Sequence, residues 1–169
     1  QLYSINKSSI KDAIIIFGNG CTGEIVSSQG LIFTNHHCGY GAIASASSVE
    51  NNYLRDGFYA KSQKDEIRSA LSVQFLIRIE DVSKEVNDSL GTLLGKARAD
   101  KQAEVLANIN KHLSNANSFI ECGVSPLFKG NPFLALVYQR YKDIRLVGTP
   151  PESVGKFGGD TDNWEWPRH

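Results

Sequence analysis

The sequence predicts a mainly β fold, an antiparallel β-barrel that carries a helical insertion. Three observations support this prediction. Short apolar or alternating runs recur along the chain, with turn residues between them. Residues 24–34 have the pattern of a β-hairpin, and residues 92–113 have the periodicity of an amphipathic helix. The order of these segments is strands, helix and strands, without internal repeats.

The first strands lie near the beginning of the chain. Residues 13–17 (AIIIF) are rich in β-branched side chains and precede a Gly-Asn-Gly turn, a pattern typical of a buried strand. Residues 24–26 and 31–34 then form the two arms of the hairpin, and residues 27–30 form its turn. The His-His-Cys run at 36–38 is therefore expected at a strand end, where the chain enters a glycine loop.

The middle of the chain contains the helical insertion. Residues 47–58 are polar with scattered apolar positions, which indicates a short helix and a loop. Residues 73–79 alternate between apolar and other side chains, as a strand does. We expect an amphipathic helix over residues 92–113, because strong helix formers surround apolar residues spaced by three or four, namely Ala99, Ala103, Leu106, Ile109 and Leu113.

The last part of the chain returns to strands. Residues 133–141 (FLALVYQRY) and 144–148 (IRLVG) are predicted to be two strands joined near Lys142 and Asp143. The remainder of the chain, up to His169, reads as a long, turn-rich loop.

Composition excludes several classes of protein. The 169 residues suit one domain or a little more, and 41% of them are hydrophobic, enough for a core. Eighteen basic residues balance eighteen acidic ones, so net charge gives no reason to expect binding to nucleic acid or to an anionic membrane. No apolar run approaches the roughly 20 residues of a membrane span.

The two ends of the sequence suggest a processed chain or a fragment. The sequence contains no methionine, and it begins within a polar stretch at Gln1. It stops at His169, directly after the dense segment NWEWPRH. We therefore expect that function depends on residues beyond these 169.

The three cysteines permit one disulfide and one spare thiol. Cys21 precedes the first arm of the predicted hairpin and Cys38 follows the second. Antiparallel pairing brings such positions to within the roughly 5.5–6 Å Cα separation of a disulfide. We therefore expect a Cys21–Cys38 bridge, which implies an oxidising compartment. Cys122 is then unpaired, or paired outside the chain.

The sequence HHC at positions 36–38 allows several interpretations. Zinc is disfavoured because zinc sites usually take ligands from spaced pairs, and because adjacent residues on a strand point to opposite faces. A Cys38 nucleophile is possible but conflicts with the expected bridge. A histidine fixed at a strand end beside a disulfide suits the general base of a serine hydrolase. Two purely structural histidines remain an equal alternative on the pattern alone.

A family resemblance favours the general-base interpretation. TNHHC resembles the T-A-A-H-C of chymotrypsin-type proteases, in which the histidine before the cysteine is catalytic and the cysteine is disulfide-bonded. The segments IFGNGCTGEIVSSQGLIFTNHHCGYGAI and GKFGGDTDNWEWPRH together resemble the bacterial dipeptidyl-peptidase 7 and 11 family of serine exopeptidases. The similarity extends over nearly the whole chain.

The resemblance implies specific site residues. His37 matches the general base, and His36 a structural companion. Asn163, Trp164 and Arg168 match residues that line the pocket for the substrate N-terminus. This agrees with their chemistry, because an asparagine carbonyl can accept from an ammonium group, an indole can pack on the substrate, and an arginine can orient a carbonyl or carboxylate.

The remaining triad members are expected outside the sequence. Asp160 and Asp162 lie in the conspicuous segment GGDTDNW, but the family's acidic member aligns just beyond His169, so the two aspartates are expected to cap turns or to support the pocket. The nucleophilic serine lies much later in the family. Residues near that serine determine whether acidic or hydrophobic residues are preferred at the second substrate position.

The resemblance implies a serine-type dipeptidyl peptidase that releases N-terminal dipeptides by acyl transfer. Residues 1–169 would form most of the first barrel of a chymotrypsin-like double β-barrel, with the second barrel and a large helical domain outside this chain. We expect no cofactor and no metal, an inactive fragment, a periplasmic or cell-surface location and a homodimeric parent protein. The alternative is a non-catalytic peptide-binding module on a protease-like barrel.

Overall fold

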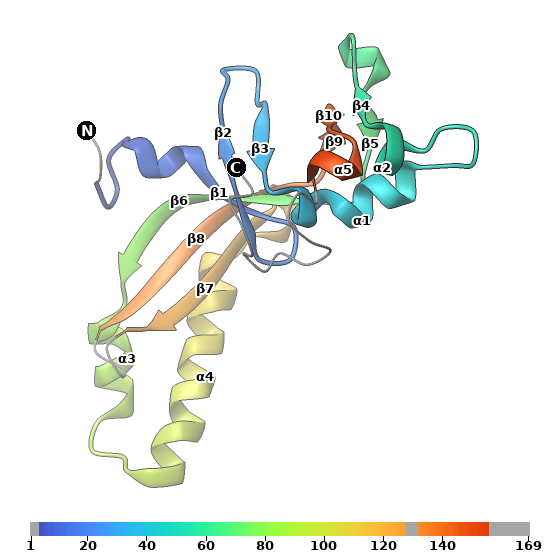
Figure 1. Cartoon of the computed structure of the whole chain (residues 1–169). Coiled ribbons are helices and arrows are strands. Elements are labelled where there is room, and N and C mark those ends of the chain that lie inside the picture. Colours follow the sequence, from blue (N-terminus) through green and yellow to red (C-terminus); the bar gives the residue numbers. More distant parts are fainter. Residues whose placement is uncertain (1–3, 128–131, 156–169) are drawn as a thin grey trace. The chain divides into compact units, whose positions relative to one another are not determined.

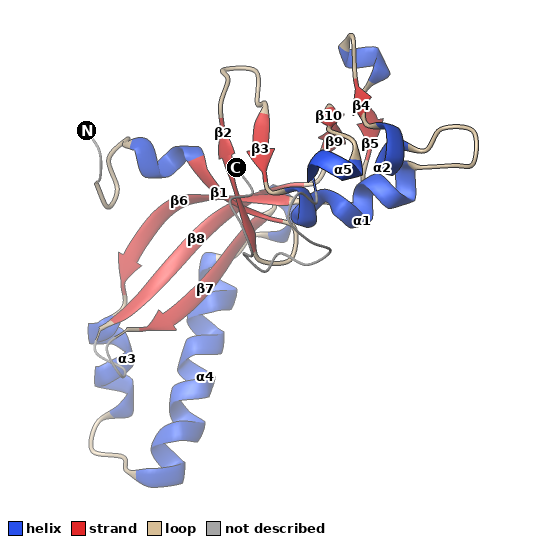
Figure 2. Ribbon diagram, viewed as in Figure 1, coloured by secondary structure: helices blue, strands red, loops and turns tan. Residues whose placement is uncertain are grey.

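The computed structural model describes residues 4–127 and 132–155, which divide into two compact units. Within these ranges, the first unit combines residues 4–14 with 74–127 and 132–140, and the second combines residues 15–73 with 141–155. Both contain strands and helices (Figure 2). The chain is mainly β with several helices, as the sequence predicts. Within the described ranges, every helix is too short or too polar to span a bilayer.

A sheet organises the first unit. Its strands β6 (Val73–Asp81), β8 (Phe133–Tyr141) and β7 (Ile120–Pro126) are neighbours in that order, with β8 in the middle. Strands β7 and β8 pair antiparallel from Ile120 opposite Gln139 to Pro126 opposite Phe133. Alternate residues of β8 are buried, so one of its faces lines a core.

Two helices form that core with β8. Helix α3 (Ser83–Leu90) leads into α4 (Gly95–Leu113), and α4 lies along β7 (Figure 1). The Asn110 side chain accepts a hydrogen bond from the Val124 amide of β7 at 3.0 Å. The buried core cluster consists of Val82, Val86, Leu90, Val105, Ile109, Phe133 and Ala135. Residues from two helices and a strand therefore share one apolar interior.

The prediction of a single helix over residues 92–113 is only partly correct. Helix α4 begins at Gly95, and the sequence interpretation missed α3, which ends at Leu90 and is capped by Gly91 with φ 49°. Gly95 itself has φ 56°, so the link between the two helices uses left-handed conformations that favour glycine. Ala99 and Ala103 are exposed. The apolar spacing therefore identifies the buried face only in the second half of the helix.

The hairpin of the second unit agrees with the sequence prediction. Strands β1 (Ile14–Phe17), β2 (Cys21–Ile25) and β3 (Ile32–Thr34) are neighbours in the order β3-β2-β1. Strands β2 and β3 pair antiparallel, with Gly23 opposite Thr34 and Ile25 opposite Ile32. The Ser27 hydroxyl accepts the Leu31 amide at 3.0 Å and holds the turn.

Short elements complete the fold. Two small antiparallel pairs join β4 (Phe58–Tyr59) to β10 (Gly148–Thr149), and β5 (Ile67–Arg68) to β9 (Arg145–Leu146). The remaining helical elements are η1 (Ile10–Ala13), α1 (His36–Ala46), α2 (Tyr53–Asp56), η2 (Gln63–Asp65), η3 (Ala116–Ser118) and α5 (Glu152–Gly155). Over the residues that the structure describes, the sheets are open and no closed barrel is found.

Leu90 tests the core of the first unit. Its side chain is 1% exposed within the cluster, so Leu90→Ala should remove apolar contacts, leave a cavity and lower the free energy of unfolding by about 2–5 kcal/mol. Leu94→Ala is the matched control, because Leu94 is 81% exposed and its truncation should change that free energy by less than about 0.5 kcal/mol. Urea denaturation measures both, and equal losses would contradict this account of the core.

Candidate active site

The His-His-Cys run lies in the first turn of helix α1, which directly follows β3 (Figure 1). Asn35 is the extended N-cap residue, with φ −69° and ψ 146°. The Cys38 amide donates to the Asn35 carbonyl at 3.0 Å and closes the first turn. Each residue of the run is therefore held in regular helical backbone.

The prediction of a glycine loop after the histidines is wrong. Gly39 and Gly41 lie inside α1, and neither has a positive φ. A helical glycine costs about 1 kcal/mol relative to alanine, but helix α1 also buries Ile43, which is 3% exposed. Burial of an apolar side chain is worth about 1.5–3 kcal/mol and offsets that cost.

A disulfide links the start of α1 to the hairpin. Cys21, the first residue of β2, is bonded to Cys38, and their Cα atoms are 6.1 Å apart. The Thr34 hydroxyl donates to the Thr22 carbonyl at 2.7 Å, which adds a second link across the base of the hairpin. Strand β2 is thus linked to the chain on both sides of Asn35, to β3 before it and to α1 after it.

The His37 imidazole lies against this disulfide. Its Nε2 atom is 3.2 Å from Cys38 Sγ and 3.8 Å from Cys21 Sγ, and the residue is exposed. Ligand atoms of these three residues lie within 4.8 Å of one another. Because the sulfurs are bonded to each other, they offer no thiolates to zinc and no nucleophile.

His36 has a different environment from His37. Its ring meets the Tyr40 ring edge-on with centroids 6.0 Å apart, and both ring nitrogens are shielded from solvent. The ring also lies over Gly155 of α5: a Cβ placed on Gly155 would be 2.5 Å from His36 Nδ1. His36 is therefore packed against Tyr40 of its own helix and Gly155 of α5, whereas His37 is exposed.

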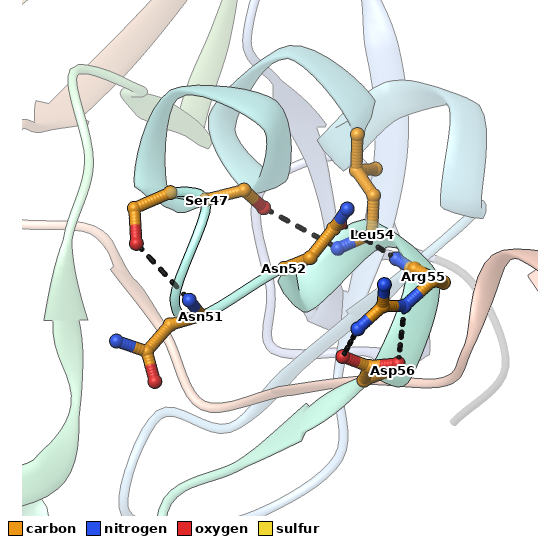
Figure 3. A network of polar contacts seen from close by, with 7 residues as sticks. Ser47, Asn51, Asn52, Leu54, Arg55 and Asp56 are labelled. Atoms are coloured by element: carbon orange, nitrogen blue, oxygen red, sulfur yellow. Dashed lines mark hydrogen bonds and ion pairs between the residues drawn. The ribbon is translucent and has the colours of Figure 1, made fainter.

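The end of α1 is joined to α2 by a polar network (Figure 3). The Ser47 hydroxyl accepts the Leu54 amide at 3.3 Å, and the Asn52 side chain caps α2 by accepting the Arg55 amide at 3.0 Å. Arg55 forms an exposed ion pair with Asp56, and its guanidinium lowers the pKa of that carboxyl group. The carboxylate of Asp56 is thus engaged within α2.

Cys122 does not form a second reactive centre. Burial, with a smaller contribution from the negative charge of Glu80, raises the pKa of its thiol above the ordinary value. The thiolate is the nucleophilic form of cysteine, so a raised pKa leaves little of it at neutral pH. In the described part of the chain, the chemistry is therefore concentrated in the first turn of α1.

The structure brings together some of the predicted site residues. It places His36, His37, Cys21 and Cys38 around the first turn of α1. The predicted pocket residues Asn163, Trp164 and Arg168 lie outside the described ranges. Asp160 and Asp162, which are expected to cap turns or to support the pocket, lie outside them too. Sequence reasoning missed Gly155, because no local pattern indicates what packs on it, and Tyr40, whose i+4 spacing from His36 could have indicated the contact.

Comparison with known proteins identifies the family. The family model described as Peptidase S46 matches residues 1–169. The chain is 48% identical to dipeptidyl-peptidase 7 of Capnocytophaga gingivalis, and 45% identical to the Asp/Glu-specific dipeptidyl-peptidase of the same organism. Both matches cover the whole chain and 24% of the relative, so the chain spans about a quarter of their length.

The solved structures agree. The crystal structure of Porphyromonas endodontalis DPP11 in complex with substrate superposes with a TM-score of 0.84 at 38% identity, covering 99% of this chain and 25% of that one. The complex of the same enzyme with the dipeptide Arg-Glu also superposes with a TM-score of 0.84 at 38% identity, covering 99% of this chain and 26% of that one. The chain belongs to the peptidase S46 family.

Proposed function

We propose that this chain supplies the general base of a serine-type dipeptidyl peptidase, with His37 as that base. The observation that carries the proposal is an exposed imidazole whose backbone is fixed in the first turn of α1 by the Cys21–Cys38 bridge. Relatives named as dipeptidyl peptidases support the same reaction class. The full-length protein would release dipeptides from the free N-terminus of oligopeptides.

In this reaction His37 removes the proton from a serine hydroxyl outside the chain and returns it to the leaving amine. The attack forms an acyl-enzyme, which water then hydrolyses with the same base. A carboxylate outside the described residues would hold the other ring nitrogen. No metal or cofactor takes part in the proposed steps, because a triad and an oxyanion hole suffice for acyl transfer.

The proposed mechanism requires the His37 ring to rotate from the orientation that the structure shows. In the structure, Nε2 faces the two disulfide sulfurs, at 3.2 and 3.8 Å. The ring must turn away from the bridge to present Nε2 to a serine hydroxyl, and its exposure leaves room for that rotation. A carboxylate hydrogen-bonded to Nδ1 would hold the turned ring in one orientation and tautomer.

We further propose the substrate, location and assembly of the full-length protein. Asn163, Trp164 and Arg168 would line the site for the substrate's ammonium group and first residues. Solved complexes of P. endodontalis DPP11 with dipeptides support a peptide substrate. The disulfide suits an oxidising compartment such as the periplasm or cell surface. The full-length protein would be a homodimer, with the second barrel and a helical domain formed by other residues.

Product analysis tests this function. The full-length protein is incubated with an octapeptide that has a free N-terminus, and the products are identified by mass spectrometry over time. We expect successive dipeptides, and no cleavage of the matched N-acetylated octapeptide, because acetylation removes the ammonium charge. Single amino acids or internal cleavage would contradict the proposal. Tight binding without cleavage would favour a non-catalytic peptide-binding module instead.

A further inference from the structure

The first turn of α1 is held on both sides of His37. Cys38, the residue after it, is bonded to Cys21 of β2. His36, the residue before it, lies over Gly155 of α5. Consecutive residues of a helix point about 100° apart, so these two attachments restrain the turn in different directions. We propose that Gly155 is a positioning residue, which through His36 fixes the backbone of His37; the inference rests on the function proposed above.

Glycine is needed at position 155 because of space. The backbone of Gly155 does not adopt the left-handed φ that favours glycine. An added Cβ would instead lie 2.5–2.7 Å from three atoms of the His36 ring, well inside van der Waals contact. The ring is itself confined by Tyr40 on the same helix. Alanine at this position would therefore displace either the imidazole of His36 or the end of α5.

Gly155 is held by its own contacts. Its amide donates to the Pro151 carbonyl at 3.0 Å. Pro151 in turn packs on Gly57, directly after α2, where an added Cβ would be 3.0 Å from Pro151 Cδ and from the Thr149 carbonyl. The backbone of Gly155 therefore has little room to move away from an added methyl group. The His36 ring is the group that would have to move instead.

Helix α2 connects this support back to α1. Helices α1 and α2 pack together, as do α2 and α5. The Ser47 hydroxyl at the end of α1 accepts the Leu54 amide of α2 (Figure 3). Helix α1 therefore contacts α2, and α2 contacts α5. The contact between Gly155 and His36 joins α5 back to the first turn of α1. Such support is what holds a reacting group within about 0.5 Å of its productive position.

Gly155→Ala in the full-length protein tests the inference. A misplacement of about 1 Å can cost on the order of 10²-fold in rate. We expect kcat for a fluorogenic dipeptide to fall about 10- to 100-fold, while KM changes by less than about threefold, because a misplaced base acts in the chemical step. Gly41→Ala is the matched control: it adds a methyl group to α1 where nothing lies within 4 Å, so kcat should be unchanged.

Two further measurements separate positioning from general damage. In a His36→Ala background, Gly155→Ala should lower kcat no further, because the new methyl group then meets no His36 ring. Hydrogen exchange of the peptide covering His36–Ala46, which needs no activity, should be faster in Gly155→Ala than in the wild type.

The outcomes are distinct for the two proposals. The inference fails if Gly155→Ala keeps the wild-type kcat, raises KM alone, or leaves hydrogen exchange in α1 unchanged. In that case Gly155 does not position the base, but the proposed function still stands if His37→Ala is inactive. If His37→Ala itself keeps wild-type turnover, the proposed function fails and the inference with it. A loss of kcat in Gly155→Ala that adds nothing to the loss in His36→Ala, together with an intact Gly41→Ala, supports both.

Discussion

His37→Ala in the full-length protein is expected to lower kcat for dipeptide release by at least about 10⁴-fold. The reason is the loss of the group that takes the serine proton, while the remaining site still binds the substrate. KM should change little, because His37 is expected to act in the chemical step. Turnover of a fluorogenic dipeptide substrate, with enzyme concentration fixed by absorbance, measures the loss.

His112→Ala is the control for this substitution. His112 is an exposed histidine in the last turn of α4, in the other unit of the chain. Its removal should leave kcat and KM unchanged. Wild-type turnover in His37→Ala, or an equal loss in both variants, would contradict the assignment of His37 as the base.

The second large effect is expected at the disulfide. Replacing Cys21 and Cys38 by serine should lower the free energy of unfolding by about 3 kcal/mol, because the bridge closes a loop with a sequence separation of 17 residues. It should also lower kcat, because the first turn of α1 then loses its attachment after His37. Guanidinium denaturation and the dipeptide assay measure the two effects.

Reductant provides an internal control for the bridge. Dithiothreitol should destabilise the wild-type protein about as much as the double serine substitution does, and should have no further effect on the double variant. Cys122→Ser tests the remaining thiol: it should leave the response to reductant intact, because Cys122 takes no part in the bridge. A double variant as stable as the wild type would show that the bridge contributes nothing to stability.

Local sequence patterns predict the hairpin but not the helix that follows it. The turn at 27–30 and the flanking apolar arms are signals within a few residues, so β3 is found within one residue of its observed bounds. Strand β2 is found only in part, because it begins at Cys21, three residues before the predicted arm. Helix α1 is missed because Gly39 and Gly41 read as turn residues, although burial of Ile43 decides for the helix. Tertiary packing here overrides propensity.

Several strand pairings are also beyond such patterns. Strand β7 (Ile120–Pro126) contains a glycine and a proline and lacks a clear strand signal, yet it pairs along its length with the predicted strand β8. Strands β4 and β10 are two residues each and meet only because the chain returns to the same place. Segments this short carry no periodicity that could identify them.

In the candidate site, too, the sequence predicts the local pairing but not the contact between distant segments. The Cys21–Cys38 pairing follows from the hairpin, because both cysteines flank the same two strands. The contact between His36 and Gly155 joins segments that are far apart in the sequence, and only the structure reveals it. The sequence disfavours zinc because the histidines are expected on a strand, but they lie in the first turn of a helix. The structure disfavours zinc for a different reason, because the nearby sulfurs are bonded to each other.

The central claim is that the two adjacent histidines have separate roles, and one comparison tests it directly. The kcat values of His36→Ala and His37→Ala are measured side by side in the full-length protein on the same dipeptide substrate. We predict that His37→Ala falls by at least about 10⁴-fold, and that His36→Ala falls by no more than about 10²-fold, because it loses only positioning. An inactive His36→Ala beside an active His37→Ala would contradict the account.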